Sequence, residues 1–360
     1  MNKKLKVVIL YNEPQPELYV KTDELSSEPT HFVPYFETEN LTPMEEYDKI
    51  VRKLRRHGLS AYTFNIKDDI FSLINNLKKK KPDVVFNFME IFHDDPTLEM
   101  NLVGLLELLG VAYTGAPQMA LANCQSKIFT KKLLRSSNLS TPLFFLQDKK
   151  IEKIEHDLNF PIIVKPAYED ASAGIRNESI VKNDEELINR INYVITYFEQ
   201  PALVEEFIDG RELNIAVLGD VKPRVLPISE IDFTEMPDHL HNIVSYEAKW
   251  EPDNEAYHKT IPICPSILPK EIEKKAKEIA LKAFKIMQCR DYARVDMRLS
   301  KDNKLYILEV NPNPDLTEGA GFMRSMETAG YSYAQALKKI IELAYSRWKR
   351  NKKNGSKKKR

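Results

Sequence analysis

The sequence has few cysteines and lacks the apolar runs that define membrane and secreted proteins. Cys124, Cys264 and Cys289 lie far apart in the 360-residue chain and show no paired spacing. This pattern is typical of neither a disulfide framework nor a zinc site, so we expect a reducing, cytoplasmic environment. No run approaches the roughly 20 apolar residues of a membrane helix. The apolar residues 7–10 near the N-terminus indicate a first strand rather than a secretory signal.

A net charge of zero conceals one strongly basic segment. Residues 347–360 contain nine Lys or Arg side chains and no acid, which leaves 44 basic and 53 acidic residues in the rest of the chain. We predict that this segment is a disordered, solvated tail. The alternative is an electrostatic contact with a nucleic acid, an anionic membrane or an acidic partner. The lysines do not alternate with aromatic side chains as they do in a surface that stacks bases, which favours the solvated tail.

The order of the predicted elements indicates an α/β region followed by α+β regions. Up to about residue 115, apolar strands (6–10, 61–65, 83–88) alternate with helices (44–57, 70–81, 98–109), which predicts a doubly wound parallel sheet. The proline-rich stretch 12–43 is predicted to be a long loop. From residue 142 short strands predominate, at 143–146, 161–166, 202–207, 213–218, 294–299 and 305–310. Helices are predicted at 127–136, 185–198, 269–287 and 333–348.

The last two predicted strands carry the most informative pattern. A turn centred on residues 302–303 places Asp296 opposite Glu309 and Arg294 opposite Asn311, with all four side chains on one face. Opposed carboxylates repel each other unless a cation lies between them. Two carboxylates and an amide oxygen are ligands that suit Mg²⁺. The pattern therefore predicts either a magnesium site or an exposed polar hairpin.

Two weaker motifs precede this hairpin. An apolar strand ends at Lys165 and continues into residues 167–175, a loop of mostly small residues. Such an arrangement brings a lysine and backbone N–H groups close to a phosphate, although it is also common in ordinary loops. In the run 203–214, acids flank a tight Asp-Gly turn, which taken alone indicates an edge hairpin with solvated charges.

Together and in this order, these elements resemble the D-alanine–D-alanine ligase branch of the ATP-grasp superfamily. Eight runs between about residues 80 and 340 match: Tyr113-Thr114-Gly115, Ser126-Lys127, Val164-Lys165-Pro166, Val204-Glu205-Glu206-Phe207, Gly210-Arg211-Glu212, Tyr246-Glu247-Ala248-Lys249, Ala293-Arg294-Val295-Asp296 and Leu308-Glu309-Val310-Asn311-Pro312. Each run alone is a weak signal, but eight in register are a strong one.

The resemblance implies an ATP-grasp fold in which two α+β lobes clamp ATP beside a doubly wound lobe. The implied N-terminal pre-ATP-grasp domain spans residues 1–118. The central lobe, with a mobile phosphate loop, spans 119–204, and the C-terminal lobe with the magnesium site spans 205–346. The basic tail 347–360 follows. Proteins of this family are often homodimers, and a second copy of this chain is an expected partner.

The resemblance also implies a role for each matching residue. The residues implied to contact ATP are Lys127 and Lys165 at the phosphates, Glu205, Glu206, Phe207 and Ile208 at the adenine, and Glu212 at the ribose. The implied ligands of Mg²⁺, or of Mn²⁺ in its place, are Asp296, Glu309 and Asn311. The implied catalytic residues are Arg294 at the transferring phosphoryl and acyl centre, Lys249 near the phosphates on a mobile loop, and Ser172 in the phosphate loop.

The chain departs from the family on the amino-acid side of the implied site. The family's glycine-serine-serine reads Asp170-Ala171-Ser172, its aromatic hydroxyl is Trp250, its histidine-glycine is Met89-Glu90, its serine-leucine is Ala320-Gly321, and a glycine is Asp315. The loss of hydroxyls that pair with a substrate lowers selectivity by orders of magnitude, so we do not expect D-alanyl-D-alanine synthesis. Glu90, Asp170 and Asp315 either attract a substrate with a cationic part or cap loops.

The sequence thus predicts an ATP-dependent ligase that activates a carboxylate as an acyl phosphate and joins it to an amine. The expected substrates are an amino acid or small peptide and an amine; we expect no membrane span, and no nucleic-acid contact except through the basic tail. Two alternatives stay open. One is a ligase that modifies a protein or peptide terminus docked by the tail. The other is a silent nucleotide-binding regulator, which the complete set of phosphate and metal positions disfavours.

Overall fold

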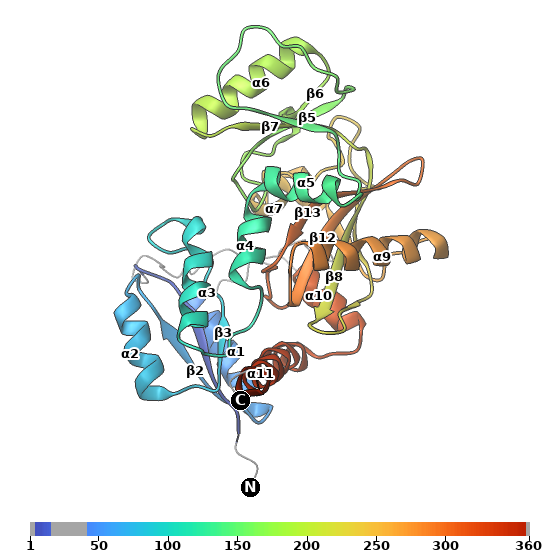
Figure 1. Ribbon diagram of the computed structural model, residues 1–360. Coiled ribbons are helices and arrows are strands. Elements are labelled where there is room, and N and C mark those ends of the chain that lie inside the picture. The colour runs from blue at the N-terminus through green and yellow to red at the C-terminus, as the bar shows by residue number, and fades with distance from the viewer. Residues whose placement is uncertain (1–3, 16–41, 358–360) are drawn as a thin grey trace.

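Three β-sheets surrounded by helices make up the protein, and the computed structural model describes residues 4–15 and 42–357 (Figure 1). The first sheet is parallel, in the order β2-β1-β3, with strands β1 (Lys6–Tyr11), β2 (Ser60–Asn65) and β3 (Val84–Asn87). Its helices are α1 (Pro43–Arg56), α2 (Ile70–Lys80) and α3 (Glu99–Leu108). The predicted alternation of strands and helices is confirmed. The predicted loop 12–43 lies mostly outside the described residues.

Local sequence signals place the elements of this first lobe. Residues 7–10 are fully buried, because a parallel strand in the middle of a sheet is covered by helices on both faces. Helix α1 begins after Thr42, whose side chain and that of Glu45 satisfy each other's backbone N–H groups, with Pro43 as the first helical residue. The strand order leaves β1 central, between its two parallel neighbours.

The second sheet is antiparallel and forms the central lobe. Its order is β4-β7-β5-β6, with strands β4 (Phe144–Gln147), β5 (Ile162–Pro166), β6 (Ile180–Val181) and β7 (Ala202–Glu206). Helix α6 (Asp184–Tyr197) packs on this sheet, and the two form a hydrophobic core of their own. The boundary that we predicted after residue 204 falls inside β7, because Glu205 and Glu206 still pair with β5.

The third sheet forms the C-terminal lobe. Its order is β11-β10-β8-β12-β13, with β9 also paired to β8; the strands are β8 (Gly210–Gly219), β9 (Arg224–Val225), β10 (Ser229–Asp232), β11 (Ile261–Ile263), β12 (Asp291–Ser300) and β13 (Leu305–Asn311). The helices of this part of the chain are α7 (Tyr246–Trp250), α8 (Glu255–His258), α9 (Lys270–Ile286) and α10 (Gly321–Thr328).

Helices α4 (Gln118–Gln125) and α5 (Lys127–Ser136) pack on the third sheet, and α5 also contacts the second sheet, where Lys131 pairs with Glu205. Ala120, Leu121 and Leu134 share a hydrophobic core with buried residues of β8, β12 and β13. The domain that we predicted over residues 119–204 stays a prediction: the C-terminal sheet completes the apolar faces of these two helices, while the charged face of α5 meets the second sheet. Both large cores contain residues of the first and third sheets. These two sheets and their helices therefore form one packed unit, which we call the base.

The hairpin β12–β13 has the predicted pairing at its polar end. Arg294 lies opposite Asn311 and Asp296 opposite Glu309, as the sequence predicts. Nearer the turn the register differs by one residue, because Leu299 pairs with Leu305. A bulge beside Asp296 absorbs this difference and restores the predicted register, so one extra residue on β13 keeps the two carboxylates opposed.

The final helix, α11 (Tyr333–Lys357), corrects the prediction of a disordered tail from residue 347. The helix continues because Arg347 is buried: its guanidinium donates to the Asp291 carboxylate at 2.7 Å and to the Tyr113 carbonyl at 2.7 Å. The Trp348 indole N–H donates to the Gly110 carbonyl at 2.8 Å. Helix α11 thereby fastens the start of β12 to the N-terminal lobe, against which it lies in Figure 1.

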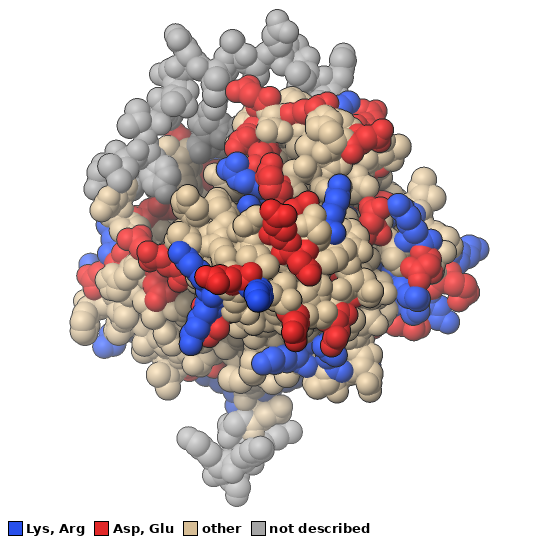
Figure 2. Space-filling view, turned by 90° about the horizontal axis from the view of Figure 1, so that it is seen from above, with Lys and Arg blue, Asp and Glu red and all other residues tan. Residues whose placement is uncertain are grey.

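Among residues 4–15 and 42–357, no helix combines the length and the apolar character that a membrane crossing needs. Figure 2 shows the molecule from above, and on this face acidic and basic side chains lie among one another. This face therefore has no extended region of purely positive charge, the feature that attracts a polyanion over a distance.

We predict that deletion of residues 347–360 destabilises the protein whereas deletion of residues 355–360 does not. The longer deletion leaves the buried Asp291 carboxylate without its arginine, a loss of about 3–5 kcal/mol in the free energy of unfolding. The shorter deletion removes basic charge and keeps every contact of Arg347. Denaturant unfolding of both truncations and of Arg347→Met, which keeps the tail, measures the difference. Equal unfolding midpoints for the two truncations would contradict the prediction.

Candidate active site

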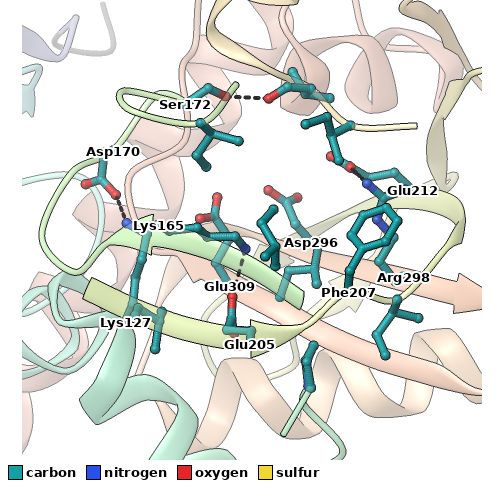
Figure 3. Close-up of a pocket in the computed structure, with 18 of the residues that line it drawn as sticks. Lys127, Lys165, Asp170, Ser172, Glu205, Phe207, Glu212, Asp296, Arg298 and Glu309 are labelled. Atoms are coloured by element: carbon teal, nitrogen blue, oxygen red, sulfur yellow. Dashed lines mark hydrogen bonds and ion pairs between the residues drawn. The ribbon is translucent and has the colours of Figure 1, made fainter. Parts of the chain in front are cut away.

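A cleft lies between the second and third sheets and gathers nearly all the predicted site residues (Figure 3). The residues that line it come from separate elements: Lys127 from α5, Lys165 from β5, Glu205 and Glu206 from β7, Glu212 from β8, Lys249 from α7, Arg294 and Asp296 from β12, Glu309 from β13, and Ser172, Phe207 and Ile208 from loops. Asn311, the remaining predicted residue, lies two positions after Glu309 on the same face of β13.

Arg294 binds the two opposed carboxylates of the hairpin. Its guanidinium contacts Asp296 in a bidentate manner, with Nε–Oδ1 at 2.8 Å and Nη2–Oδ2 at 2.7 Å, and lies 3.7 Å from Glu309. The Asp296 side chain is only 7 % exposed. Burial raises the pKa of its carboxyl to about 6, although Arg294 acts in the opposite direction. The negative charge of Asp296 is thus only partly compensated in this arrangement.

The donor set of the hairpin fits a hard divalent cation. Asp296 and Glu309 face each other, and the Asn311 Oδ1, which accepts from the Asn313 N–H at 2.9 Å, retains a second lone pair. No group of three Asp, Glu, His or Cys side chains suited to a metal occurs in the described part of the chain. Two carboxylates and one amide oxygen leave coordination positions for phosphate oxygens, as in magnesium–nucleotide sites.

Glu205 is buried between two lysines. Its carboxylate, 1 % exposed, lies 2.8 Å from Lys165 Nζ and also contacts Lys131 Nζ. Burial alone would raise the pKa of Glu205, but the two lysines outweigh it and lower the pKa to about 2. Lys131, which the sequence analysis missed, is itself buried and donates to Thr141 Oγ1 at 2.7 Å. Its position four residues after Lys127 places both lysines on one face of α5.

Arg298 is the second charged residue that the sequence analysis missed. It lies opposite Glu212 in the pairing of β12 with β8, and its guanidinium contacts that carboxylate at 2.9 Å. It also donates to the Asn242 carbonyl at 2.6 Å and lies 6.0 Å from the Phe207 ring. Residues 294, 296 and 298 alternate along one face of β12, so the period of two contained the signal.

The loop of residues 167–175 and the segment formed by Val244 and helix α7 meet over the cleft. The Ser172 hydroxyl donates to the Val244 carbonyl at 2.8 Å, and the Trp250 indole N–H donates to the Ala171 carbonyl at 3.0 Å. Between these loops and the hairpin, burial and the nearby Arg294 lower the pKa of Lys249. The structure therefore brings the predicted phosphate loop and the predicted lysine loop into direct contact.

Acidic side chains gather beside the end of the hairpin, where the chain departs from the family pattern. Desolvation by the surrounding protein atoms and the charges of Asp315 and Asp170 together raise the pKa of Glu90 to about 7, although its side chain reaches the solvent. Burial and Glu90 raise the pKa of Glu99 to about 8, although Asn313 donates to the Glu99 carboxylate at 3.1 Å. Asp315 also accepts from the Thr317 backbone N–H at 2.8 Å, so it caps a turn as well.

A parallel first lobe, two antiparallel sheets and a cleft of lysines and opposed carboxylates between them define an ATP-grasp ligase. The fold agrees with the solved D-alanine–D-alanine ligase of Bacillus anthracis complexed with ATP, at a TM-score of 0.68 and 22 % identity over 96 % of this chain and 99 % of that one.

Sequence comparison defines the family. Residues 139–342 match the family model described as the D-ala D-ala ligase C-terminus. D-alanine–D-alanine ligase B of Chromobacterium violaceum is 32 % identical over 82 % of this chain and 90 % of its own length. An uncharacterized protein of Sinorhizobium fredii, y4sG, is also 32 % identical, over 74 % of this chain and 75 % of its own length. The chain belongs to the D-alanine–D-alanine ligase family.

Family membership confirms the predicted fold class and enzyme class. The protein is an ATP-dependent carboxylate–amine ligase of the ATP-grasp type, and its family uses ATP and a divalent metal.

We predict that Glu205→Gln destabilises the protein, because it leaves two lysine charges without a buried partner. Loss of one member of a buried charge group costs about 3–5 kcal/mol in the free energy of unfolding. The folded-state pKa of about 2 lies below the ordinary value of 4.5, so the Glu205 charge stabilises the fold above pH 4.5 and the effect is lost as the pH falls toward 2.

Denaturant unfolding from pH 7 down to pH 3 measures this difference. The gap in stability between wild type and Glu205→Gln is expected to narrow below about pH 4.5. The exposed Glu185→Gln on α6 is the matched control and is expected to change stability by less than about 0.5 kcal/mol. A constant gap over the whole pH range would contradict the assignment of the charge network.

Proposed function

We propose that this enzyme joins the carboxylate of an amino acid or small peptide to an amine acceptor with a cationic part, using Mg-ATP, and that it is not a D-alanyl-D-alanine synthase. The observation that carries the proposal is the contrast between the two sides of the cleft. The nucleotide side keeps the family's charged residues, whereas the amino-acid side lacks the family's hydroxyls and has the carboxyls of Glu90, Glu99 and Asp315 beside it, coupled electrostatically to one another or to Asp170 of the cleft.

On the nucleotide side, the lysines and the strand β7 divide the recognition of ATP. Lys127 and Lys165 bind phosphate oxygens as point charges. The backbone of residues 205–208 forms the hinge that reads the adenine edge, and Glu212 accepts hydrogen bonds from the ribose hydroxyls. Because Arg298 fixes the Glu212 carboxylate at 2.9 Å, this acceptor is already oriented before the nucleotide arrives.

Asp296, Glu309 and Asn311 are the proposed ligands of Mg²⁺. When bound there, the metal would neutralise charge on the transferring phosphoryl group. In the first step a substrate carboxylate oxygen forms a bond to the γ-phosphorus and ADP leaves, which gives an acyl phosphate. Arg294 and Lys249 stabilise the charge that develops on the transferring group, so the protein supplies position and electrostatics rather than a covalent intermediate.

In the second step the neutral amine nitrogen attacks the acyl carbon, inorganic phosphate leaves with the electron pair of the broken C–O bond, and the nitrogen loses one proton to the departing phosphate or to solvent, which gives the amide. Arg294 lies beside both hairpin carboxylates and is proposed to stabilise the oxyanion of the tetrahedral intermediate. Ser172 and its loop close the cleft, excluding water that would hydrolyse the acyl phosphate.

The acceptor chemistry follows from the acids. Asp315 and Asp170 help to raise the pKa of Glu90, and Glu90 and Asp170 help to raise that of Glu99, so a positive charge is favoured here and a further carboxylate is not. Ala171 and Ala320 leave no side-chain hydroxyl for the substrate at the positions where the family has serines. The turn-capping bond of Asp315 shows that this residue also has a structural contact, so Glu90 is the sharper probe of acceptor binding.

We predict ADP release that requires one acid together with one amine and that is lost in Asp296→Asn and in Glu309→Gln. Removal of a metal ligand is expected to lower kcat by about 10²-fold or more, since the phosphoryl charge loses its counterion. A panel of amino acids, dipeptides, diamines and polyamines with Mg-ATP identifies the pair, and Glu185→Gln is the control that keeps activity. Tight ATP binding without turnover for any pair would favour the protein-terminus modifier or the silent regulator.

We predict that the KM for the cationic acceptor falls as the pH rises from about 6 to about 8. Glu90 and Glu99, with pKa values of about 7 and 8, lose their protons over this interval, and only the carboxylates attract the cation. Glu90→Gln is expected to raise that KM by on the order of tenfold to a hundredfold and to flatten the pH dependence. An unchanged acceptor preference in Glu90→Gln and Asp315→Asn would leave these acids as turn caps only.

A further inference from the structure

One carboxylate lies against a lysine that the proposed function assigns to ATP. Lys127 Nζ donates to Asp170 Oδ1 at 2.9 Å and also contacts the carbonyl of Glu169, and Figure 3 shows this pair at one end of the cleft. Burial lowers the pKa of Lys127, but Asp170 and Glu309 outweigh burial and raise it. Asp170 therefore supplies part of the negative charge that a bound phosphate would supply.

The two partners differ sharply in their surroundings. The Lys127 side chain is 13 % exposed, whereas the Asp170 side chain is 73 % exposed. The carboxylate thus reaches from the solvent to a lysine that is mostly enclosed. Breaking an ion pair with an exposed carboxylate costs little free energy, because water solvates the released carboxylate.

The loop that carries Asp170 has a defined shape. Ala171 and Ser172 have φ angles of 53° and 64°, which produce a tight left-handed turn directly after Asp170. The Ala171 and Ile175 carbonyls accept from the Trp250 indole N–H at 3.0 Å and the Tyr246 backbone N–H at 2.7 Å. Because the turn is anchored through its backbone, the Asp170 side chain can rotate away while the loop stays in place.

We propose that Asp170 is an internal competitor of ATP: it binds Lys127 in the nucleotide-free protein, and the nucleotide phosphates must displace it. This inference rests on the proposed function, because it takes Lys127 as a phosphate ligand. A phosphate beside Lys127 brings negative charge close to the Asp170 carboxylate, and like charges at that distance repel. Since the family has a glycine at this position, the competition is a property of this chain within its family.

The displaced carboxylate remains near the acceptor acids. Asp170 already contributes to the raised pKa of both Glu90 and Glu99. Once Lys127 no longer neutralises it, its full charge adds to theirs. Nucleotide binding thereby increases the attraction for a cationic acceptor, which favours an order of binding with ATP first.

The test is the affinity of purified wild type, Asp170→Asn and Glu169→Gln for adenylyl imidodiphosphate, an ATP analogue that is not hydrolysed, with Mg²⁺ in isothermal titration calorimetry. Asp170→Asn is expected to bind the analogue about three- to tenfold more tightly, since the competing ion pair is gone. Glu169→Gln removes the same charge one residue away, but its side chain contacts Gln200 at 2.9 Å and not Lys127, so its affinity is expected to match wild type.

Adenosine provides the control on the ligand side. It occupies the adenine and ribose positions without phosphates, so its affinity is expected to be equal in wild type and Asp170→Asn. Equal or weaker binding of the analogue by Asp170→Asn would overturn the inference, as would equal tightening in Glu169→Gln. If the wild type binds neither ligand, the proposed function itself fails. If it binds both but Asp170→Asn changes nothing, only the competition fails.

Discussion

The cleft depends on one constraint: it contains the cations that a polyanionic nucleotide needs, and buried cations are costly without counterions. In this structure four of these cations have a carboxylate partner from the chain itself. Lys165 contacts Glu205, Lys127 contacts Asp170, Arg294 contacts Asp296, and Arg298 contacts Glu212. The partners come from three different strands and one loop, and the Lys127–Asp170 pair joins helix α5 to the loop that follows β5. The affinity for the nucleotide consequently depends on how much the cation–phosphate contacts exceed, in free energy, the cation–carboxylate contacts that the chain already makes.

The two sides of the cleft obey this constraint differently. On the nucleotide side acids and bases alternate, so that the local charge is nearly balanced before ligands bind. On the acceptor side, desolvation and the charges of neighbouring acids raise the pKa values of Glu90 and Glu99 to about 7 and 8. A cationic acceptor would supply the positive charge that these mutually repelling carboxyls favour.

Sequence reasoning located the hairpin, the lysines and the hinge because their signals are local: alternation along a strand, a lysine at a strand end, and motifs in register. It placed Asp296 opposite Glu309 although the register near the turn differs by one residue from the predicted one, because a bulge on β13 compensates. It missed Lys131 and Arg298 because their partners, Glu205 and Glu212, are far away in sequence and their pairing depends on strand registers that no local pattern encodes. The end of α11 was wrong for the same reason, since the partner of Arg347 is Asp291 at the start of β12.

The shared cores of the first and third sheets have a mechanical consequence. Helix α11 and two common hydrophobic clusters make these lobes a single base, whereas the central lobe has a core of its own. Its chain joins the base at only two places, between α5 and β4 and between β7 and β8. We expect rotation of the central lobe, where it occurs, to take place about the line that joins these two crossings. Arg298 and Glu212 lie on the base near the second crossing, so the ribose acceptor would keep its geometry while the loop of residues 167–175 moves.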